Sequence, residues 1–242
     1  MFNKIRYLFS NSDEFLNEFN FPLTIKRSDR RTISLIVRDG KLLVRCPTFS
    51  LDKKIYDLIA QKKNWIKKNI DKQNQNFRIS NEMYFQKKIF LFKGFQKKLH
   101  LQNSNQEYIY LTKDKIVISG KNLNTNAIKV LLNNWYKNYS YDYFEQKLIF
   151  YSKKMNLITN KLIIREYKTK WGLCSFRKKI IYLNWRLVMA PESVLDYVII
   201  HELCHLIEPN HSKSFWNQVE KYKSDYKKDK MWLKENGFLL FF

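Results

Sequence analysis

Three of the four histidines in this chain fall within eleven residues of its C-terminal half. They are His201, His205 and His211, in the stretch YVIIHELCHLIEPNHSKSFW. On a helix, side chains four residues apart project from the same face, so the rings of His201 and His205 can meet one ion. Glu202 stands beside this pair, where its carboxylate can reach a metal-activated water without being a ligand. The spacing therefore predicts a metal site with an adjacent acid–base residue.

A third ligand is expected nearby, because catalytic zinc sites use three protein ligands and keep one position open for water. His211 is the candidate, since Pro209 stops the helix and allows the chain to fold back toward the ion. The offsets of the histidines equal those of H-E-x-x-H-x-x-G-x-x-H, but Glu208 stands where that pattern has glycine. The turn must therefore be made by Pro209 and Asn210. Glu208 in place of His211 is the alternative third ligand.

The surroundings of the histidines favour a catalytic zinc ion over other interpretations. The helix is strongly apolar around the pair, so buried imidazoles without a partner would be costly. Cys204 could be proposed as a ligand or nucleophile, but it points away from the histidine face and is explained as a small buried residue. A structural zinc site would need four protein ligands, usually cysteines. The expected chemistry is hydrolysis by a metal-activated water, with Glu202 as general base.

The composition describes a folded chain with a large excess of positive charge. Hydrophobic residues make up 45% of the 242 residues, which is ample for a globular core. The formal net charge is +23, because 45 Lys and Arg outnumber 22 Asp and Glu. Most of the cations are lysines spread along the chain, so solvated lysine faces are the simpler interpretation. Contact with a polyanion or nucleic acid through this basic surface is the alternative.

The cysteines and the hydropathy pattern predict a cytoplasmic protein without a membrane segment. Three cysteines at unrelated spacings, with no Cys-x-x-Cys pair, do not suggest a disulfide framework. Asp13, Glu14 and Glu18 interrupt the N-terminal region, where a signal peptide would need an apolar stretch. No run approaches the roughly 18 apolar residues of a membrane span. The apolar end, GFLLFF, is expected to pack against the body of the protein.

The elements that would position the site predict an α+β fold with two regions. Residues 1–123 read as a β-rich region: an antiparallel meander over 22–47 with a hairpin at Asp-Gly, a helix over 51–70, a polar connection, and antiparallel strands within 84–119. Residues 124–242 read as a zincin-like α+β region that carries the H-E-x-x-H helix. It has a long helix from Asn124, two strands with KTKWGLCSFRK between them, the active helix beginning at Pro191, and one last helix from Ser212.

Several segments outside the histidine cluster resemble the YgjP-like metallopeptidase family, distant relatives of the SprT-like zinc proteases. The segment REYKTKWGLCS is similar to the family's R-x-x-K-x-x-W-G-S-C, through Arg165, Lys168, Trp171, Gly172 and Cys174. The segments YLNWRLVMAPESVLDYVIIHELCHL and NHSKSFW resemble the family's strand, proline turn, active helix and third-ligand segment. The chain departs from the family pattern within this segment, because Leu173 occupies a position where the family usually has serine.

The resemblance implies a peptidase with zinc ligands at His201, His205 and His211 and a general acid/base at Glu202. It also implies that REYKTKWGLCS forms a strand and turn beside the active helix. Arg165, Tyr167 or Lys168 could stabilise the developing oxyanion, with structural packing of that segment as the alternative. Trp171 is expected in the core.

Three functions remain to be compared. The leading one is a cytoplasmic zinc metallopeptidase acting on a peptide or protein. The second is a metal-dependent hydrolase of phosphoanhydrides such as nucleotides, for which the lysines would suit but no Gly-rich phosphate loop is present. The third is a non-catalytic nucleic-acid-associated module, for which charge is the sole argument.

Overall fold

The computed structural model describes residues 21–242, and these residues form two compact units. The first unit ends at Ile79 and the second runs from Ser80 to Phe242. The expected boundary between residues 123 and 124 does not coincide with this division, because the strands of residues 89–120 contribute to the core of the second unit. The acidic N-terminal stretch that argued against a signal peptide lies outside the described residues.

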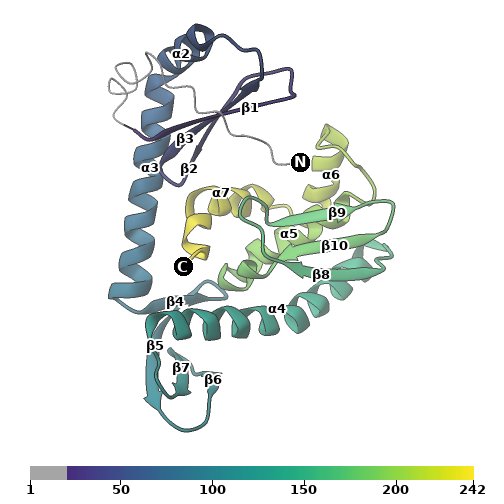
Figure 1. The fold of residues 1–242 in the computed structure, drawn as a ribbon. Helices are drawn as coiled ribbons and strands as arrows, with labels where there is room; N and C mark the ends of the chain where they lie inside the picture. Colours follow the sequence, from purple (N-terminus) through teal and green to yellow (C-terminus); the bar gives the residue numbers. More distant parts are fainter. Residues whose placement is uncertain (1–20) are drawn as a thin grey trace, which may run out of the picture. The chain divides into compact units, whose positions relative to one another are not determined.

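The first unit contains one three-stranded sheet, formed by β1 (Leu23–Ser28), β2 (Ser34–Arg38) and β3 (Lys41–Pro47) (Figure 1). The expected hairpin joins β2 to β3, and its turn residues Asp39 and Gly40 have φ of 53° and 69°, as a tight Asp-Gly turn requires. The predicted antiparallel meander is wrong, because β1 pairs in parallel with β3 and the strand order is β1-β3-β2. β3 is the central strand because it pairs with both others, and its alternate residues are apolar and fully buried.

Two helices complete the first unit, α2 (Asp52–Gln61) and α3 (Lys63–Asn81). The predicted helix over 51–70 is therefore divided at Lys62, and its second part continues through the stretch expected to be a polar connection. That stretch has no Gly or Pro, and Gln73 ties it to the hairpin. Its side chain donates to the carbonyl of Val37 (2.9 Å) and accepts from the amide of Gly40 (3.1 Å).

A four-stranded sheet begins the second unit. Its strands are β4 (Ile89–Phe92), β5 (Phe95–Asn103), β6 (Tyr108–Leu111) and β7 (Lys115–Gly120), in the order β4-β5-β7-β6. Strands were expected here, but β5 and β7 pair in parallel rather than antiparallel. The first strand also starts later than expected, because Glu82–Gln86 form a π-helix, η1, that buries Tyr84. The hydroxyl of Tyr84 donates to the carbonyl of Leu239.

The expected long helix follows as α4 (Thr125–Met155). Its start is fixed by Asn124, whose side chain accepts from the amide of Ala127 (2.9 Å), and its end by Asn156 in the left-handed conformation. Tyr136, fully buried on this helix, donates its hydroxyl to the carbonyl of Leu91 (2.7 Å). α4 thus links the four-stranded sheet to the core of the unit.

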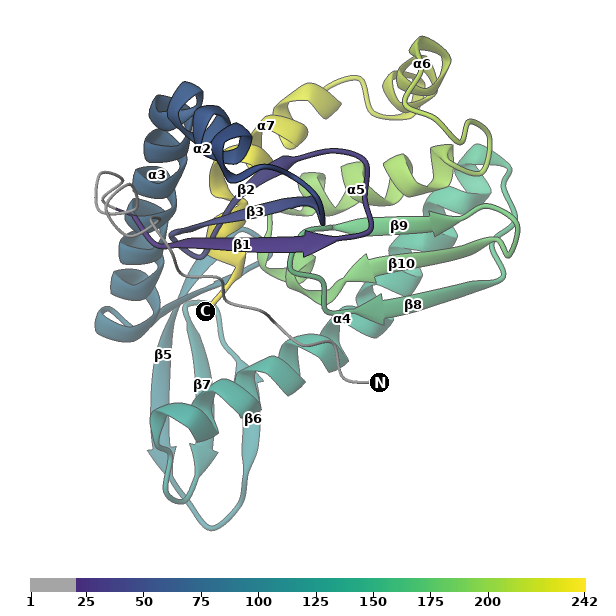
Figure 2. The same ribbon diagram turned by 45° about the horizontal axis from the view of Figure 1, so that its top comes forward.

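The third sheet contains both strands expected in the C-terminal half and one more between them. β8 (Lys161–Arg165), β9 (Gly172–Ser175) and β10 (Ile180–Asn184) lie in the order β8-β10-β9. β8 is parallel to β10 and β9 antiparallel to it, so β9 is an edge strand. Helix α4 contacts β8, and α5 (Glu192–Cys204) contacts β9 and β10 (Figure 2). The sheet therefore supports α5, the helix with the histidines.

The last expected helix is two helices, α6 (Lys213–Tyr222) and α7 (Tyr226–Asn236), separated at Lys223. The break lets Tyr226 stack on Trp216, with ring centroids 5.2 Å apart, and lets the Lys223 ammonium lie 2.9 Å from Asp229. After α7, the short helix η3 (Gly237–Leu240) leads into the apolar end of the chain. The expected packing of this end is confirmed, since Phe242 contacts the rings of Tyr84, Phe90, Tyr136 and Trp185.

Strands and helices thus combine in an α+β fold, as the sequence predicts. The second unit has one large apolar core, to which both of its sheets and α4 to α7 contribute. Within residues 21–242, no helix combines the length and the apolar character that crossing a membrane requires.

Candidate functional site

The helix α5 is almost completely buried, and the site lies at its C-terminal end. Pro191 caps its start and Glu192 occupies the first turn, where a negative charge is favourable. The helix ends at Cys204, earlier than a stop at Pro209 alone would give, and His205 is its C-cap. His205 keeps right-handed backbone angles, so His201 and His205 still present their rings on the same side, with centroids 5.0 Å apart.

The three histidines of the sequence motif converge in space. Their ligand atoms all lie within 4.8 Å of one another, and the Nε2 atoms of His201 and His211 are 3.0 Å apart. The Nδ1 atom of His205 lies 3.2 Å from the carbonyl oxygen of Glu208, which leaves its Nε2 atom free to face the other two rings. Within residues 21–242, this is the one such group of three potential metal ligands.

The loop between α5 and α6 carries His211 to the pair. Glu208 does not join the cluster, because its carboxylate accepts a hydrogen bond from Ser214 Oγ (3.0 Å) at the start of α6. Ser212 caps α6 by accepting from the amide of Phe215 (3.2 Å), and so fixes the chain directly after His211. The chain thus folds back at Pro209 and Asn210, as the sequence predicts.

An aromatic wall from α6 holds the three rings. Phe215 is fully buried, and its ring centroid lies 4.9, 4.6 and 4.8 Å from those of His201, His205 and His211. Trp216 stacks on His211 at 5.7 Å. These contacts restrict the imidazoles on the side away from α5.

Burial keeps two of the imidazoles neutral at physiological pH. It lowers the pKa of His201 to about 3, with further contributions from His205, His211 and Lys230. The pKa of His205 is also lowered, mainly by burial, against the opposing hydrogen bond to Glu208. A neutral imidazole has a free nitrogen lone pair, which is the form that binds a metal ion.

Glu202 lies next to this cluster in an apolar setting. Its side chain is buried, with 5% of its surface exposed, and burial raises its pKa to about 8. The positive charge of Lys170 acts in the opposite direction. Such a carboxyl group can take up and release a proton near neutral pH, which suits a general acid or base.

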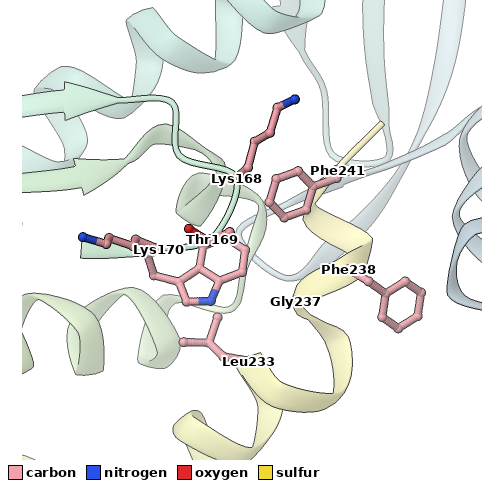
Figure 3. A pocket seen from close by; sticks show the side chains of 8 residues that line it. Lys168, Thr169, Lys170, Leu233, Gly237, Phe238 and Phe241 are labelled. Atoms are coloured by element: carbon pink, nitrogen blue, oxygen red, sulfur yellow. The ribbon is translucent and has the colours of Figure 1, made fainter. Parts of the chain in front are cut away.

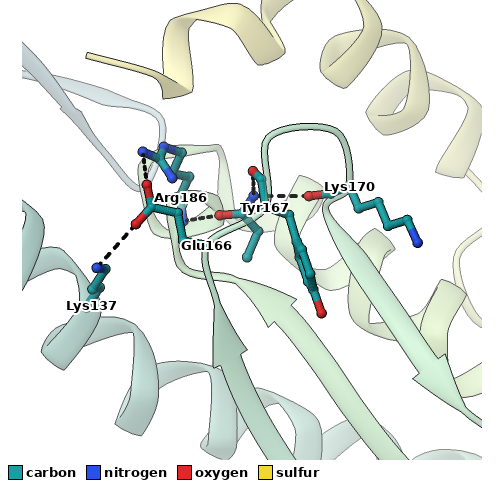
Figure 4. Close-up of polar contacts among 6 residues, drawn as sticks. Lys137, Glu166, Tyr167, Lys170 and Arg186 are labelled. Atoms are coloured by element: carbon teal, nitrogen blue, oxygen red, sulfur yellow. Dashed lines mark hydrogen bonds and ion pairs between the residues drawn. The ribbon is translucent and has the colours of Figure 1, made fainter. Parts of the chain in front are cut away.

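The segment that resembles the family motif forms the end of β8, a loop and β9. Asn184 of β10, fully buried, holds this loop by donating to the carbonyls of Tyr167 (2.8 Å) and Lys170 (3.0 Å). Glu166 in the same loop pairs with Arg186 (3.0 Å) and Lys137 (3.3 Å), as Figure 4 shows. The loop is therefore fixed to the sheet and to α4.

The three residues considered for oxyanion stabilisation are not equivalent. Arg165 and Lys168 are exposed, whereas Tyr167 is half-buried. Burial raises the pKa of Tyr167, Arg165 opposes this, and Tyr182 and Glu202 add to it. Tyr167 is thus the one of the three that is partly shielded from solvent and within the electrostatic influence of Glu202.

A cavity of about 270 Å³ lies on the loop, between it and the C-terminal helices (Figure 3). Lys168 and Trp171 line it from the loop, and Leu233, Phe238 and Phe241 from α7 and the end of the chain. Trp171, expected in the core, is half-buried and forms one wall of this cavity.

Three residues at the site have roles that the sequence reasoning missed. Phe215 packs on all three imidazoles, Asn184 fixes the loop, and Gly172 gives the side chain of Glu202 its space. Gly172 had a signal, since an isolated glycine in a strand often marks a close approach. Phe215 and Asn184 had none, because contacts between elements are not visible in a local pattern. Cys204 is fully buried, and burial raises its thiol pKa to about 12, so it is not a reactive thiol.

Comparisons with known proteins cover residues 31–236 for a family model and about two fifths of the chain for solved structures. The family model described as YgjP-like, metallopeptidase domain, matches residues 31–236. No curated protein matches this chain. Among solved structures, the chain is similar to the zymogen of the metallopeptidase abylysin from Pyrococcus abyssi, at 26% identity and a TM-score of 0.36, over 39% of this chain and 95% of that one. The zymogen of jannalysin from Methanocaldococcus jannaschii matches at 28% identity and a TM-score of 0.35, over 40% of this chain and 96% of that one.

The two solved structures superpose on only part of this chain, so the assignment to a family rests on the family model alone. That match extends from the connection between β1 and β2 to the end of α7, and it includes the histidine cluster and the loop before β9. The resemblance seen in the sequence is thereby confirmed, and the chain belongs to the YgjP-like metallopeptidase family.

Proposed function

We propose that this protein is a zinc-dependent peptidase in which His201, His205 and His211 hold the ion and Glu202 is the general base. The observation that carries this proposal is the convergence of three imidazoles beside a buried carboxylate. Membership of a metallopeptidase family supports the reaction class.

The donor set fits zinc. Zinc favours nitrogen ligands at about 2.0–2.1 Å in a tetrahedral shell, which places two ligand atoms roughly 3.3 Å apart. The 3.0 Å between the Nε2 atoms of His201 and His211 is close to that value. Hard cations such as magnesium and calcium favour oxygen ligands instead, and no carboxylate belongs to the described cluster. When bound, the ion would supply Lewis-acid activation of a water molecule and of the carbonyl under attack.

The side chains of this protein then have separate tasks. The three imidazoles, which pack against Phe215, would hold the ion at the end of α5, and the carbonyl of Glu208 orients the ring of His205. The Glu202 carboxylate accepts the proton of the attacking water and then gives it to the nitrogen of the leaving amine, while the C–N bond breaks. Its buried setting suits both transfers, because a raised pKa stabilises the protonated intermediate form. Tyr167 is the candidate hydrogen-bond donor to the developing oxyanion.

The substrate is expected to be a peptide or protein, in keeping with the family, and the cytoplasm remains the expected compartment. Reduced cysteines fit that setting, since Cys46, Cys174 and Cys204 are all free thiols. A nucleotide substrate is the second candidate for the same site. Contact with nucleic acid finds no support in the family match.

The test compares the zinc-loaded wild type with Glu202→Gln and Glu208→Gln, each incubated with an unfolded protein. Mass spectrometry of the products and a metal assay are read together. New fragments are expected from the wild type and Glu208→Gln, with Glu202→Gln at least about a hundredfold slower and still loaded with zinc. Cleavage by Glu202→Gln at the wild-type rate would disprove the general-base assignment. Intact substrate with all three proteins would point to nucleotides as the next substrates.

A further inference from the structure

The side chain of Glu202 lies directly on the backbone of β9, at Gly172. A Cβ atom added to Gly172 would lie 2.7 Å from Cγ and 2.8 Å from Cδ of Glu202, and nearer still to Oε1. These distances are shorter than real Cβ contacts. A side chain at position 172 and the present position of the Glu202 carboxylate therefore exclude each other.

The glycine is not needed for the backbone conformation. The glycines with positive φ in the described chain are Gly40 and Gly94, and Gly172 is not among them. Alanine could adopt the backbone angles of Gly172 without strain. What this position requires is space, and Glu202 is the residue that occupies it.

The strand has little freedom to move away from Glu202. Gly172 is in register with Leu183 of β10, and the preceding carbonyl, of Trp171, accepts from the amide of Asn184 (2.8 Å). The Asn184 side chain holds the rest of the loop through its two donated hydrogen bonds, and its Oδ1 atom accepts from the amide of Arg186 (3.2 Å). These hydrogen bonds hold the start of β9, whereas the contacting atoms of Glu202 belong to the end of a side chain that can turn about its single bonds, so a new Cβ would displace Glu202 rather than β9.

We propose that Gly172 is a positioning residue for Glu202. Because Gly172 has no side chain, it leaves free the space that the Glu202 carboxylate occupies beside the three histidines. This role rests on the proposed function, in which Glu202 moves the proton. It acts through Glu202 and requires no contact between Gly172 and the substrate.

The first test is Gly172→Ala in the zinc-loaded protein, with Gly120→Ala as the matched control. Gly120 is the last residue of β7, as Gly172 is the first of β9, but a Cβ at Gly120 would have a leucine side-chain atom at 3.2 Å as its nearest neighbour. We expect Gly172→Ala to lower kcat at least tenfold, because misplacement of a catalytic group by about 1 Å can cost a hundredfold. KM and zinc content should stay within twofold of the wild type, and Gly120→Ala should keep the wild-type kcat.

The second test needs no substrate and asks whether the effect passes through Glu202. The melting temperature is measured for the wild type, Gly172→Ala, Glu202→Ala and the double variant, which form a cycle. Gly172→Ala should lower the melting temperature when residue 202 is glutamate and have little effect when it is alanine. An equal fall in melting temperature with glutamate and with alanine at position 202 would mean that the new methyl group clashes with atoms other than those of Glu202. That result would overturn the proposal.

The outcomes separate this inference from the proposed function. If the wild type cleaves, Glu202→Gln does not, and Gly172→Ala keeps the wild-type kcat, the positioning role is wrong and the general base stands. If the zinc-loaded wild type cleaves nothing, the proposed function fails and takes this role with it.

Discussion

The first and third sheets of this protein have the same construction and differ in what packs against them. In both, the first strand pairs in parallel with the third and the second pairs antiparallel with it, which gives the orders β1-β3-β2 and β8-β10-β9. The buried helix residues in the core of the first unit, on α2 and α3, are all isoleucines. The helix against the third sheet, α5, carries the buried Glu202 and leads into the histidine cluster.

The difference shows that the strand arrangement does not by itself determine function. The strand β2, SLIVR, has a side chain at every position, whereas its counterpart β9 starts with Gly172. At Gly172 the strand leaves room for the Glu202 carboxylate, whereas the polar side chain of α3 that meets the first sheet, Gln73, hydrogen-bonds its hairpin. The proposed site is thus a local modification of a strand arrangement that occurs twice in this chain.

The largest expected effect is the loss of metal binding at the C-terminal end of α5. His205→Ala removes a proposed metal ligand, so bound zinc should fall and peptidase activity should drop at least about a hundredfold. The control is His100→Ala, which alters the one histidine outside the cluster, exposed on β5. Metal analysis and a cleavage assay check both variants. Full zinc occupancy in His205→Ala would contradict the three-histidine site.

The comparison predicts a different result for the first sheet. Ile59→Ala leaves a cavity at a fully buried position and should cost about 2–5 kcal/mol of stability. The activity of the folded protein, assayed well below the unfolding transition, should remain that of the wild type. Ile199→Ala, equally buried but on α5, should lower both the stability and the zinc affinity. Loss of activity in folded Ile59→Ala would show that the first unit contributes to catalysis.

A smaller effect is expected where α6 meets α7. Lys223→Met leaves the Asp229 carboxylate buried without its ammonium partner, which should cost about 1–3 kcal/mol. The exposed pair of Lys227 and Glu220, 3.8 Å apart, is the control, and Lys227→Met should change the stability by no more than about 1 kcal/mol. Chemical denaturation of the two variants measures the difference. Equal losses would argue against a structural role for the break at Lys223.

The smallest effect is a pH dependence of the loop before β9. Burial acts to raise the pKa of Glu166, but the hydrogen bonds and charges of Arg186 and Lys137 outweigh it and hold that pKa below its ordinary value. The folded-state pKa is therefore lower than the unfolded one. The stabilisation is present above the unfolded pKa and is lost as the pH falls through the folded one.

This dependence can be isolated with Glu166→Gln. Its melting temperature should be below that of the wild type at pH 7. The difference should shrink as the pH falls below the unfolded-state pKa of about 4.3 and through the lower folded-state pKa. A difference that stays constant over this range would mean that Glu166 stabilises the loop by packing and not by charge.

Local patterns in the sequence were enough for most elements of the structure. The Asp-Gly turn, the start of α4 at Asn124 and the start of α5 at Pro191 all depend on neighbouring residues, and all three are present. The parallel pairing of β1 with β3 could not be read in the same way. It depends on which edge of the hairpin a distant strand reaches, and alternation along a strand does not contain that information.

For the site, the sequence by itself determined which residues approach one another. Helical spacing brings His201 and His205 together, and the proline after them allows His211 to return, because these are properties of a short stretch of backbone. The tertiary structure decided how the group is surrounded. Separate elements supply the residues that surround it: Phe215 packs on the imidazoles, Asn184 holds the loop, and Gly172 leaves space for Glu202. Their contacts exist only once the core has packed, because close packing of distant elements fixes the space left for each side chain.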